Sequence, residues 1–482
     1  MAEGSAGAER PRQRQADLAA LVAFGAIVLA LFVSRGVALV GSDTFFNLVL
    51  GRSIATRGLP ETNTLTWLEH GAPWVDQQWL AHLAWFEIAQ IGGFGLVLAV
   101  RVALFALTLA LCVRAARAEG APADRIALVG LAAAALILPH TVVRAQSFAE
   151  PLFAGLLGVL LRDARAPSPR VYWAVPILAW WSNVHGSVLL GLGLVVMSQV
   201  ARLVARPRPS VLRGALLVAA SACASFASPY GAKLLPYFRS TAGNARFSTF
   251  VEEWGPPSLR VVPDYFAVLA AAVGIAILGR RALRPFAGLA LFALALLSAT
   301  ALRHGIFLGI ALVALLPAPL DAALPPKVLR FRDFRVNIAA AAIVVAVAVA
   351  MLARVLPTAD LRIAARWPRA AAAVAARAAG PSGRVFADDR HADWLLWCAP
   401  ELEGRVAFDT RLELLSPADL DAVNAVQGGD PAPLADYDVA LATRERPGVE
   451  AAARRAGWTK TEGTDGADVY TRATPREGTE AQ

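Results

Sequence analysis

A carboxylate stands directly after the first long apolar run of this sequence. The segment Gly41–Pro60, GSDTFFNLVLGRSIATRGLP, carries Asp43 near its start. If residues 43–56 form a helix, Asp43, Asn47 and Gly51 share one face because they are four residues apart. A helix of this kind lies in the membrane surface and turns its polar stripe away from the lipid. Asp43 is a candidate general base on that stripe; it also suits the N-cap of the same helix, and the two roles are compatible.

Further polar side chains that could do chemistry lie at the ends of later apolar runs. Ionisable groups at membrane depth are costly and usually serve a function. We therefore expect these side chains to converge on one side of a membrane, although each one alone is better explained as an interfacial aromatic or a hydrogen-bonded histidine. They are Trp74, Asp76, Gln78, Arg144, Asn183, His185, Tyr230, Glu252, Trp254, Arg303 and His304.

The elements that must position these residues are membrane helices. The chain has 482 residues, of which 57% are hydrophobic and 17% are charged, and soluble proteins carry about 25% charged residues. The net charge of +9 would suit a nucleic-acid-binding protein. The arginines instead lie in short clusters between apolar runs, as membrane topology requires. We expect the lipid bilayer as a partner and no nucleic acid.

The apolar runs predict about eleven membrane spans. Residues 77–91 form a further helix that we expect to lie in the interface, because it carries two glutamines, a histidine and a glutamate. The connections rich in arginine alternate with connections poor in it, which predicts a cytoplasmic N-terminus in a multi-pass protein of the cell (inner or plasma) membrane. The predicted spans are 17–40, 93–116, 124–141, 147–163, 170–184, 187–205, 210–228, 263–280, 284–300, 304–320 and 335–356.

The chain is expected to have two domains. Residues 1–357 form the membrane domain, with functional outer loops at 42–92 and 228–262, and residues 358–482 form a small extracytoplasmic α/β domain. Short β runs (RVFAD, RVAFDT and DVALAT) alternate there with helical segments, and a hairpin closes the chain. Asp388, Asp389, Asp409 and Arg411 follow the β runs. Turn and cap chemistry explains them better than a ligand site.

An ordered set of motifs resembles one family. The set comprises D-T-F-F-N-L, P-W-V-D-Q-Q-W-L-A, R-A-Q-S, W-S-N-V-H-G-S, S-P-Y-G, E-E-W and L-R-H, followed by GRVFADDRHADWLLW in the tail. Together these look like bacterial membrane glycosyltransferases of the GT-C class, which use polyprenyl-phosphate sugars, over about residues 40–415. The sequence departs from the family pattern at Phe45-Phe46-Asn47, where Trp-Trp-His is expected, and at Asn63 and Gln78, where carboxylates are expected. These departures weaken the case for a metal more than the case for Asp43.

The resemblance implies transfer of a sugar from a polyprenyl-phosphate carrier to a glycan, lipid or protein acceptor, outside the cytoplasm. Asp43 would be the base and Glu252 a second catalytic carboxylate. Arg144 and Arg303 would bind the phosphate, with His304 a weaker candidate. The other substrate-binding candidates are Asn47, Trp74, Asp76, Gln78, Asn183, His185, Tyr230 and Trp254, with the tryptophans stacking on sugar rings.

A metal and two other functions remain open. A divalent cation, Mg²⁺ or Mn²⁺, would be bound by Asp43 with Glu252, because both ions prefer carboxylate oxygens. A transporter of lipid-linked glycans is the first alternative function, although transporters usually show internal repeats and polar residues at mid-membrane. A catalytically inactive GT-C-like scaffold is the second, and the residues at Asn63 and Gln78 favour it.

Overall fold

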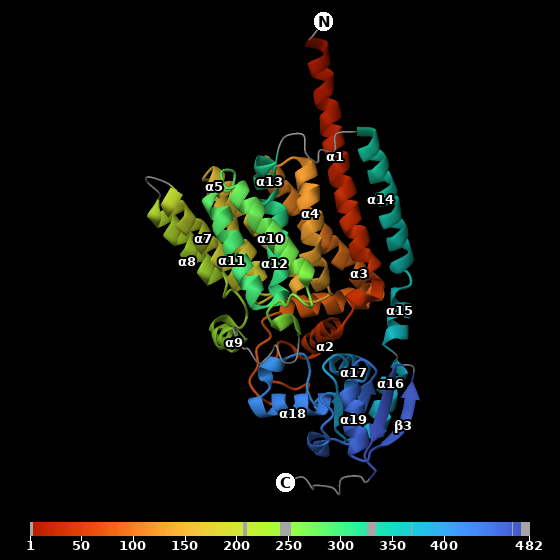
Figure 1. The fold of residues 1–482 in the computed structure, drawn as a ribbon. Helices are drawn as coiled ribbons and strands as arrows, with labels where there is room; N and C mark the ends of the chain where they lie inside the picture. The colour runs from red at the N-terminus through yellow and green to blue at the C-terminus, as the bar shows by residue number, and fades with distance from the viewer. Residues whose placement is uncertain are drawn as a thin grey trace. The chain divides into compact units, whose positions relative to one another are not determined.

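The computed structural model describes residues 3–205, 210–241, 252–324, 334–367, 369–464 and 466–473 (Figure 1). The chain forms two compact units. The helical unit comprises Met1–Leu39, Leu98–Ala232 and Ala245–Pro357, and the mixed unit comprises Val40–Val97, Lys233–Asn244 and Thr358–Gln482. The mixed unit thus contains the tail together with residues 40–97 and 233–244. The sequence prediction, with its single boundary at 357, assigns both of these ranges to the membrane domain.

The helical unit is built of apolar helices joined by short connections. Short 3-10 helices stand at several of their ends: Gly36–Leu39, Leu138–His140, Pro169–Trp173, Glu252–Trp254 and Leu302–His304. The helices are α1 (Glu3–Ser34), the second part of α3 (Trp79–Ala118), α4 (Ala123–Ile137), α5 (Gln146–Arg165), α6 (Ala174–Trp181), α7 (Val188–Ala205), α8 (Val211–Ala224), α10 (Pro263–Leu278), α11 (Pro285–Thr300), α12 (Gly305–Leu315), α13 (Pro317–Ala323) and α14 (Phe334–Val355).

Helix α12 lies in the core of the helical unit. All of its residues are apolar and all are buried, as expected of a helix with no polar face. It packs against α4, α5 and α11, while α1 runs beside α14 and α4 (Figure 1). Helix α14 is mostly exposed although it is apolar, and Ile343 and Val349 are among its exposed side chains. An exposed apolar helix of this length is what a lipid environment requires.

Within the described residues, four helices are long and apolar enough to cross a membrane: Gln15–Ser34, Trp79–Ala118, Ala123–His140 and Arg335–Val355. A fifth span forms if Leu302–Leu315 and Pro317–Ala323, bent by 55°, count as one. The other predicted spans also fall on helices, and these have 8 to 20 residues. A bilayer core about 30 Å thick needs about 20 helical residues. The chain is therefore a helical membrane protein with several spans, and the number eleven remains a prediction.

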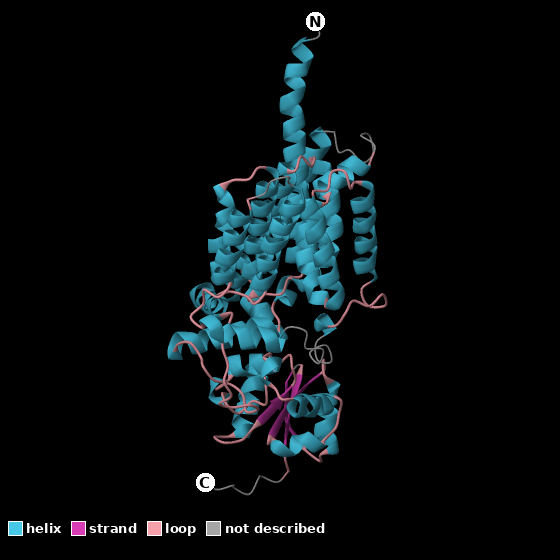
Figure 2. Cartoon of the chain, turned by 90° about the vertical axis from the view of Figure 1, so that its left-hand side faces the viewer, coloured by secondary structure: helices cyan, strands magenta, loops and turns pink. Residues whose placement is uncertain are grey.

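The mixed unit carries a four-stranded sheet among helices (Figure 2). The strand order is β1-β2-β4-β3; β1 and β2 are parallel, and the other pairs are antiparallel. The elements are α2 (Ser42–Arg57), the first part of α3, α9 (Leu234–Thr241), α15 (Ala359–Arg366), α16 (Arg369–Ala379), β1 (Val385–Ala387), α17 (Ala392–Cys398), α18 (Pro417–Gln427), β2 (Val439–Thr443), α19 (Pro447–Arg455), β3 (Thr459–Thr464) and β4 (Ala467–Thr471).

One of the predicted β runs is not a strand. RVFAD and DVALAT contain β1 and β2, but RVAFDT (405–410) contributes only isolated bridges from Val406 to Val385 and to Thr66. The run ends because Asp409 Oδ1 accepts a hydrogen bond from the Arg411 backbone N–H at 2.9 Å, which turns the chain away from the sheet.

Helix α3 changes direction at a glycine pair. Gly92 and Gly93 have non-helical backbone angles, and φ of Gly93 is +58°, a conformation that favours glycine. Asp360 Oδ1 accepts a hydrogen bond from the Phe94 N–H at 3.1 Å just after the kink. The kink separates the first part of α3, which begins at Trp79 within the interfacial helix predicted over residues 77–91, from the predicted span that begins at 93.

Candidate functional site

Asp43 lies in the first turn of α2. Gly41 is the N-cap, and its N–H donates to Thr44 Oγ1 at 3.2 Å. The prediction that Asp43 is the N-cap is therefore wrong, because the helix begins one residue earlier, at Ser42. A carboxylate in the first turn is still favoured by the helix dipole. Asp43 is half-buried, unlike most of the residues that follow it in α2.

The predicted polar stripe of α2 packs against α3. Asn47 is 1% exposed and its amide donates to the Asp43 carbonyl oxygen. A Cβ added at Gly51 would lie 2.3 Å from the His82 carbonyl oxygen, so only glycine permits this approach. The prediction that Asn47 binds substrate is therefore not supported: residues four apart do share a face, and at Gly51 that face meets the backbone of α3.

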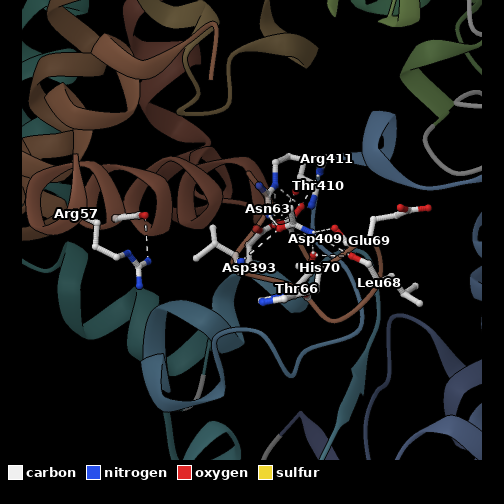
Figure 3. A network of polar contacts seen from close by, with 12 residues as sticks. Arg57, Asn63, Thr66, Leu68, Glu69, His70, Asp393, Asp409, Thr410 and Arg411 are labelled. Atoms are coloured by element: carbon white, nitrogen blue, oxygen red, sulfur yellow. Dashed lines mark hydrogen bonds and ion pairs between the residues drawn. The ribbon is translucent and has the colours of Figure 1, made fainter. Parts of the chain in front are cut away.

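Asp43 belongs to a group of acidic side chains in the mixed unit. We call Asp43, Asp393, Asp409 and Glu413, with Arg411, the carboxyl cluster. Asp393 on α17 is fully buried, and its Oδ2 accepts hydrogen bonds from the Thr410 N–H at 3.2 Å and from the Thr410 hydroxyl (Figure 3). Its other oxygen, Oδ1, is buried without a hydrogen-bond partner among the described residues. The negative charge of Asp43 acts on Asp393.

Arg411 is the cation of the carboxyl cluster and is itself buried. Its Nε lies 3.0 and 2.9 Å from the two carboxylate oxygens of Asp409, and its Nη2 lies 2.6 Å from Asp409 Oδ2. Nη2 also donates to Asn63 Oδ1 at 2.8 Å (Figure 3). The guanidinium carbon lies 4.5 Å from the centroid of the Trp74 ring. Trp74 is 7% exposed and covered by Arg411, so the prediction that it stacks on a sugar is not supported.

Two carboxyl groups of this cluster keep their protons more strongly than usual. Burial, with the negative charge of Asp409 beside it, holds the pKa of Asp393 well above its ordinary value. Burial also raises the pKa of Glu413 to about 7, although Arg411 opposes that shift. Asp409 is ion-paired with Arg411, so the cluster combines one buried ion pair with groups that tend to be neutral acids.

Asp76 serves the start of α3. Its Oδ2 lies 2.7 Å from His82 Nδ1 and its Oδ1 accepts from the Gln78 N–H at 3.0 Å. Asp76 and His82 are both buried. Asp76 therefore fixes the turn just before α3 and orients an imidazole, and its predicted contact with substrate is still a prediction. Gln78 is half-buried beside it.

The helical unit holds a second group of charges, which we call the arginine cluster: Arg35, Arg101, Arg144 and Arg303 with Glu150 and Glu253. Arg35 Nη1 donates to Thr141 Oγ1 at 3.1 Å, and Arg101 Nε donates to the Thr141 carbonyl oxygen at 3.2 Å. Arg101 also forms a buried bidentate pair with Glu150 at 2.9 and 2.8 Å. Arg35 and Arg101 thus fix the turn after α4.

The exposed side of the arginine cluster contains three residues predicted from the sequence. Arg144 Nη1 lies 2.8 Å from Glu253 Oε1, and His140 Nδ1 lies 3.7 Å from Glu253 Oε2. The Arg303 guanidinium carbon lies 4.0 Å from the Trp254 ring centroid. Burial opposes ionisation of Glu253, but Arg144, the hydrogen bond from His140 and the charge of Arg303 outweigh it and hold the pKa of Glu253 well below its ordinary value.

The carboxylate in this group is Glu253, whereas the sequence prediction chose its neighbour Glu252. The side chain of Glu252 lies outside the described residues, so its predicted catalytic role is still a prediction. Two adjacent glutamates in E-E-W give no sequence signal that separates them. The choice depends on which one points toward Arg144, and only the fold decides that.

The other predicted residues make local contacts. Asn183 Nδ2 donates to the carbonyl oxygens of Ala179 and Ala227, both at 2.8 Å. His185 Nδ1 lies 2.7 Å from Ser187 Oγ, and Tyr230 is 7% exposed. His304 Nδ1 lies 3.2 Å from the Leu297 carbonyl oxygen. The predicted convergence is thus partial: Arg144, Trp254 and Arg303 come together with Glu253, and His304 adjoins Arg303.

Among the described side chains, no group of three or more His, Cys, Asp or Glu is arranged to hold a metal ion. The predicted cation pair, Asp43 with Glu252, includes a side chain that the structure does not describe. The carboxyl cluster, although rich in acidic groups, does not form such a group either; Arg411 already takes the oxygens of Asp409.

Comparison with known proteins gives similarity of fold only. No protein-family model matches the chain, and no curated protein matches it. The crystal structure of ArnT from Cupriavidus metallidurans bound to undecaprenyl phosphate is similar, with 15% identity, a TM-score of 0.48, and coverage of 93% of this chain and 97% of that one. The apo oligosaccharyltransferase of Archaeoglobus fulgidus is also similar, with 9% identity, a TM-score of 0.46, and coverage of 93% and 74%.

Both of these proteins are GT-C glycosyltransferases, the class that the sequence motifs resemble. A shared fold does not establish a shared function. At identities of 9–15% and TM-scores below 0.5, the function of this chain has to be argued from its own residues.

Proposed function

We propose that this protein is a membrane glycosyltransferase that moves a sugar from a polyprenyl-phosphate carrier to an acceptor hydroxyl on the extracytoplasmic side. The arginine cluster is the observation that carries the proposal. Four arginines against two glutamates leave an excess of positive charge where helical connections meet, and a membrane protein retains such charges for a function. A lipid phosphate is the anion that a membrane supplies at that depth.

Arg144 and Arg303 are the proposed phosphate-binding residues. The planar guanidinium suits phosphate oxygens, because it offers two parallel N–H donors. Glu253 holds the Arg144 side chain at 2.8 Å, and Trp254 supports that of Arg303, so both side chains are ordered before a ligand arrives. Such preorganisation lowers the cost of binding and of stabilising the leaving group.

Asp43 is the proposed base. In the transfer, the acceptor oxygen forms a bond to the anomeric carbon while the bond from that carbon to the phosphate oxygen breaks. The phosphate leaves with the electron pair, and the acceptor proton passes to a carboxylate. Asp43 is half-buried, as is Glu413, whereas Asp393 is fully buried and Asp409 is already paired with Arg411. The donor sugar and the acceptor are not assigned.

The test is sugar transfer in proteoliposomes by the native chain and by Asp43→Asn, with a panel of polyprenyl-phosphate sugars. Loss of a general base lowers the rate about 10²–10⁴-fold. Asp264→Asn is the matched control, because Asp264 is an exposed aspartate in the first turn of α10. Transfer by both native chain and Asp43→Asn would remove Asp43 as the base, with Glu252 next to be tested. A native chain that transfers nothing would favour the scaffold or the transporter.

A further inference from the structure

Helix α2, which carries Asp43, is bound to the tail at its beginning and along its length. The Phe45 ring meets the Trp367 ring edge-on, with centroids 5.0 Å apart. Later in the helix, Arg57 Nη1 lies 2.6 Å from Glu403 Oε2. Both tail residues lie in the same compact unit as α2.

Arg52 connects α2 to the tail through several contacts. Its Nη2 donates to the Leu396 carbonyl oxygen at 2.8 Å, and its Nη1 donates to the Trp397 carbonyl oxygen at 3.2 Å. These two carbonyl groups lie in the last turn of α17, where helical carbonyls have no partner within the helix. The guanidinium carbon also lies 5.3 Å from the Trp397 ring centroid. The Arg52 cation therefore caps the C-terminal carbonyl groups of α17. The same helix carries Asp393.

The loop after α2 extends the edge of the tail's sheet. The Trp67 N–H donates to the Val406 carbonyl oxygen at 2.7 Å, and the Gly404 N–H donates to the Leu65 carbonyl oxygen at 2.8 Å. Val406 in turn bridges to Val385 of β1. Edge strands expose unpaired backbone groups, and this loop supplies the partners.

Asn63 fixes that loop with both ends of its amide. Nδ2 donates to Thr66 Oγ1 at 2.8 Å and to the carbonyl oxygens of Leu68 and Glu69, both at 3.1 Å. Oδ1 accepts from Arg411 Nη2 at 2.8 Å. Asn63 is fully buried. An aspartate would lose the donors and place a carboxylate against two carbonyl oxygens, so this position requires an amide.

This requirement gives a physical reason for one departure from the family pattern. A carboxylate was expected at position 63, and its absence favoured an inactive scaffold. Here the amide joins the loop to Arg411, whose guanidinium also holds Asp409 and covers Trp74. The substitution therefore serves the link between the loop and the tail, and it is no evidence that a catalytic group was lost.

We propose that residues 358–482 are a positioning part of the transfer machinery: through Arg52 and Asn63–Arg411 they hold the helix that presents Asp43. Arg52, Asn63 and Arg411 are positioning residues, since they act through α2 and its loop. The inference rests on the proposed function. It assigns the tail a role other than acceptor binding alone, because its contacts are made to the helix that carries the proposed base.

The test is single-turnover sugar transfer with the full-length protein in excess, for Arg52→Met, Asn63→Asp and the control Arg390→Met. Arg390 is an exposed tail arginine whose side chain pairs with Glu445. A misplacement of about 1 Å can lower a rate about 100-fold. We expect the first-order rate constants of Arg52→Met and Asn63→Asp to fall at least about 10-fold, with donor affinity changed less than about twofold, because the proposed phosphate residues lie in the other unit.

The rate constant separates positioning from simple loss of folded protein: while folded protein stays in saturating excess, misfolding leaves the first-order rate constant unchanged, and once folded protein falls below the donor, the amplitude of the first turnover drops. Amide hydrogen exchange over residues 42–57 is a second readout, and we expect faster exchange in Arg52→Met but not in Arg390→Met. Native rate constants in both variants would overturn the positioning role and leave the proposed function intact. A native chain without transfer activity would overturn the function and the positioning role with it.

Discussion

The arginine cluster and the carboxyl cluster bury charge in opposite ways. In the helical unit, arginines outnumber glutamates, and every described glutamate of the cluster is ion-paired to an arginine. In the carboxyl cluster of the mixed unit, the four acidic groups outnumber the one arginine assigned to the cluster, Arg411, which pairs with Asp409. Excess cations in the first cluster can be balanced by an anionic ligand. Excess carboxyl groups in the second are balanced by protons, as the raised pKa values of Asp393 and Glu413 indicate.

This difference shows two ways to offset the free-energy cost of burying a charge: pairing with an opposite charge and neutralisation by a proton. Arginine does not give up its proton, so a group of arginines has to find anions. A carboxyl group can be either ionised or protonated. A buried acidic group can therefore become neutral by binding a proton and does not need a cationic partner. The first arrangement suits binding of a phosphate, and the second suits transfer of a proton, which is the division of labour that the proposed reaction needs.

The largest effect is expected from breaking a buried ion pair of the arginine cluster. Arg101→Met leaves Glu150 buried without its bidentate partner, and such losses cost about 3–5 kcal/mol of unfolding free energy. Unfolding of the purified protein in detergent micelles measures it. Arg390→Met, which breaks an exposed pair with Glu445, is expected to cost less than about 1 kcal/mol. Equal effects of the two variants would show that burial is not what distinguishes the pairs.

Ligand binding should distinguish the two clusters directly. Arg144→Gln removes a charged donor and is expected to weaken polyprenyl-phosphate binding by about 1.5–3 kcal/mol, or about 10- to 100-fold. Isothermal titration with polyprenyl phosphate measures this. Arg57→Gln, an exposed arginine of the mixed unit, is the control and should bind like the native chain. Unchanged affinity in Arg144→Gln would remove the arginine cluster as the phosphate site.

Packing of α2 against α3 is the next contact to break. Gly51→Ala places a Cβ within 2.4 Å of Phe86 Cβ and 2.3 Å of the His82 carbonyl oxygen, and most of these atoms cannot move without the backbone. Overpacking of this kind costs about 1–3 kcal/mol. The matched control is Gly155→Ala, a helical glycine of α5 with open space around it, which should be neutral or slightly stabilising. Thermal unfolding of both variants compares them, and a neutral Gly51→Ala would refute the close approach.

The smallest effect concerns the pH dependence of stability. In the folded protein the pKa of Glu413 is raised to about 7. In the unfolded protein a glutamate has a pKa of about 4.3. The folded state thus binds more protons between these values, so its stability falls as pH rises from about 4.3 to about 7 and is level above that. We expect the difference in unfolding free energy between about pH 5 and about pH 8 to be about 1–2 kcal/mol smaller in Glu413→Gln than in the native chain. Unfolding measured at these two pH values gives that difference.

Glu253 of the arginine cluster is expected to affect the pH dependence of stability in the opposite direction to Glu413. Its folded pKa lies well below its ordinary value, so its contribution is present above the ordinary pKa of a glutamate and is lost as pH falls further. Glu253→Gln should therefore leave the change between about pH 5 and about pH 8 unaltered. The same pH dependence in native chain and Glu413→Gln would show that Glu413 titrates normally.

Much of the secondary structure could be predicted because apolar periodicity and length report on local environment. The kink at Gly92 and Gly93 separates two predicted helices, and four of the five β segments named or implied in the tail are strands. RVAFDT failed because Asp409 bonds to the Arg411 backbone, which no β propensity reveals. The candidate site residues also differ in how much of their environment the local sequence reveals. Arg144, Trp254 and Arg303, which lie near Glu253, could be proposed from the sequence because charged and aromatic residues at the ends of membrane runs are conspicuous; their role in substrate binding is still a prediction.

Residues inside the carboxyl cluster could not be predicted. Asp393 and Glu413 lie about 350 residues after Asp43 in the sequence, and each looks like an ordinary polar residue of a small α/β domain. Trp74 and Asn47 were predicted to meet substrate because of their type, but Arg411 covers the first and α2 packs the second away from solvent. Glu252 and Glu253 were indistinguishable by composition.

By itself, the sequence determined that this is a helical membrane protein with several apolar helices and that a tail of mixed helices and strands follows them. Those properties follow from hydropathy and charge, which each short segment carries locally. Only the tertiary structure decided that the first loop joins the tail and that Asn63 bonds to Arg411, 348 positions away. Hydrogen bonds, burial and the charge of neighbours depend on partners distant in the chain, so no local pattern records them.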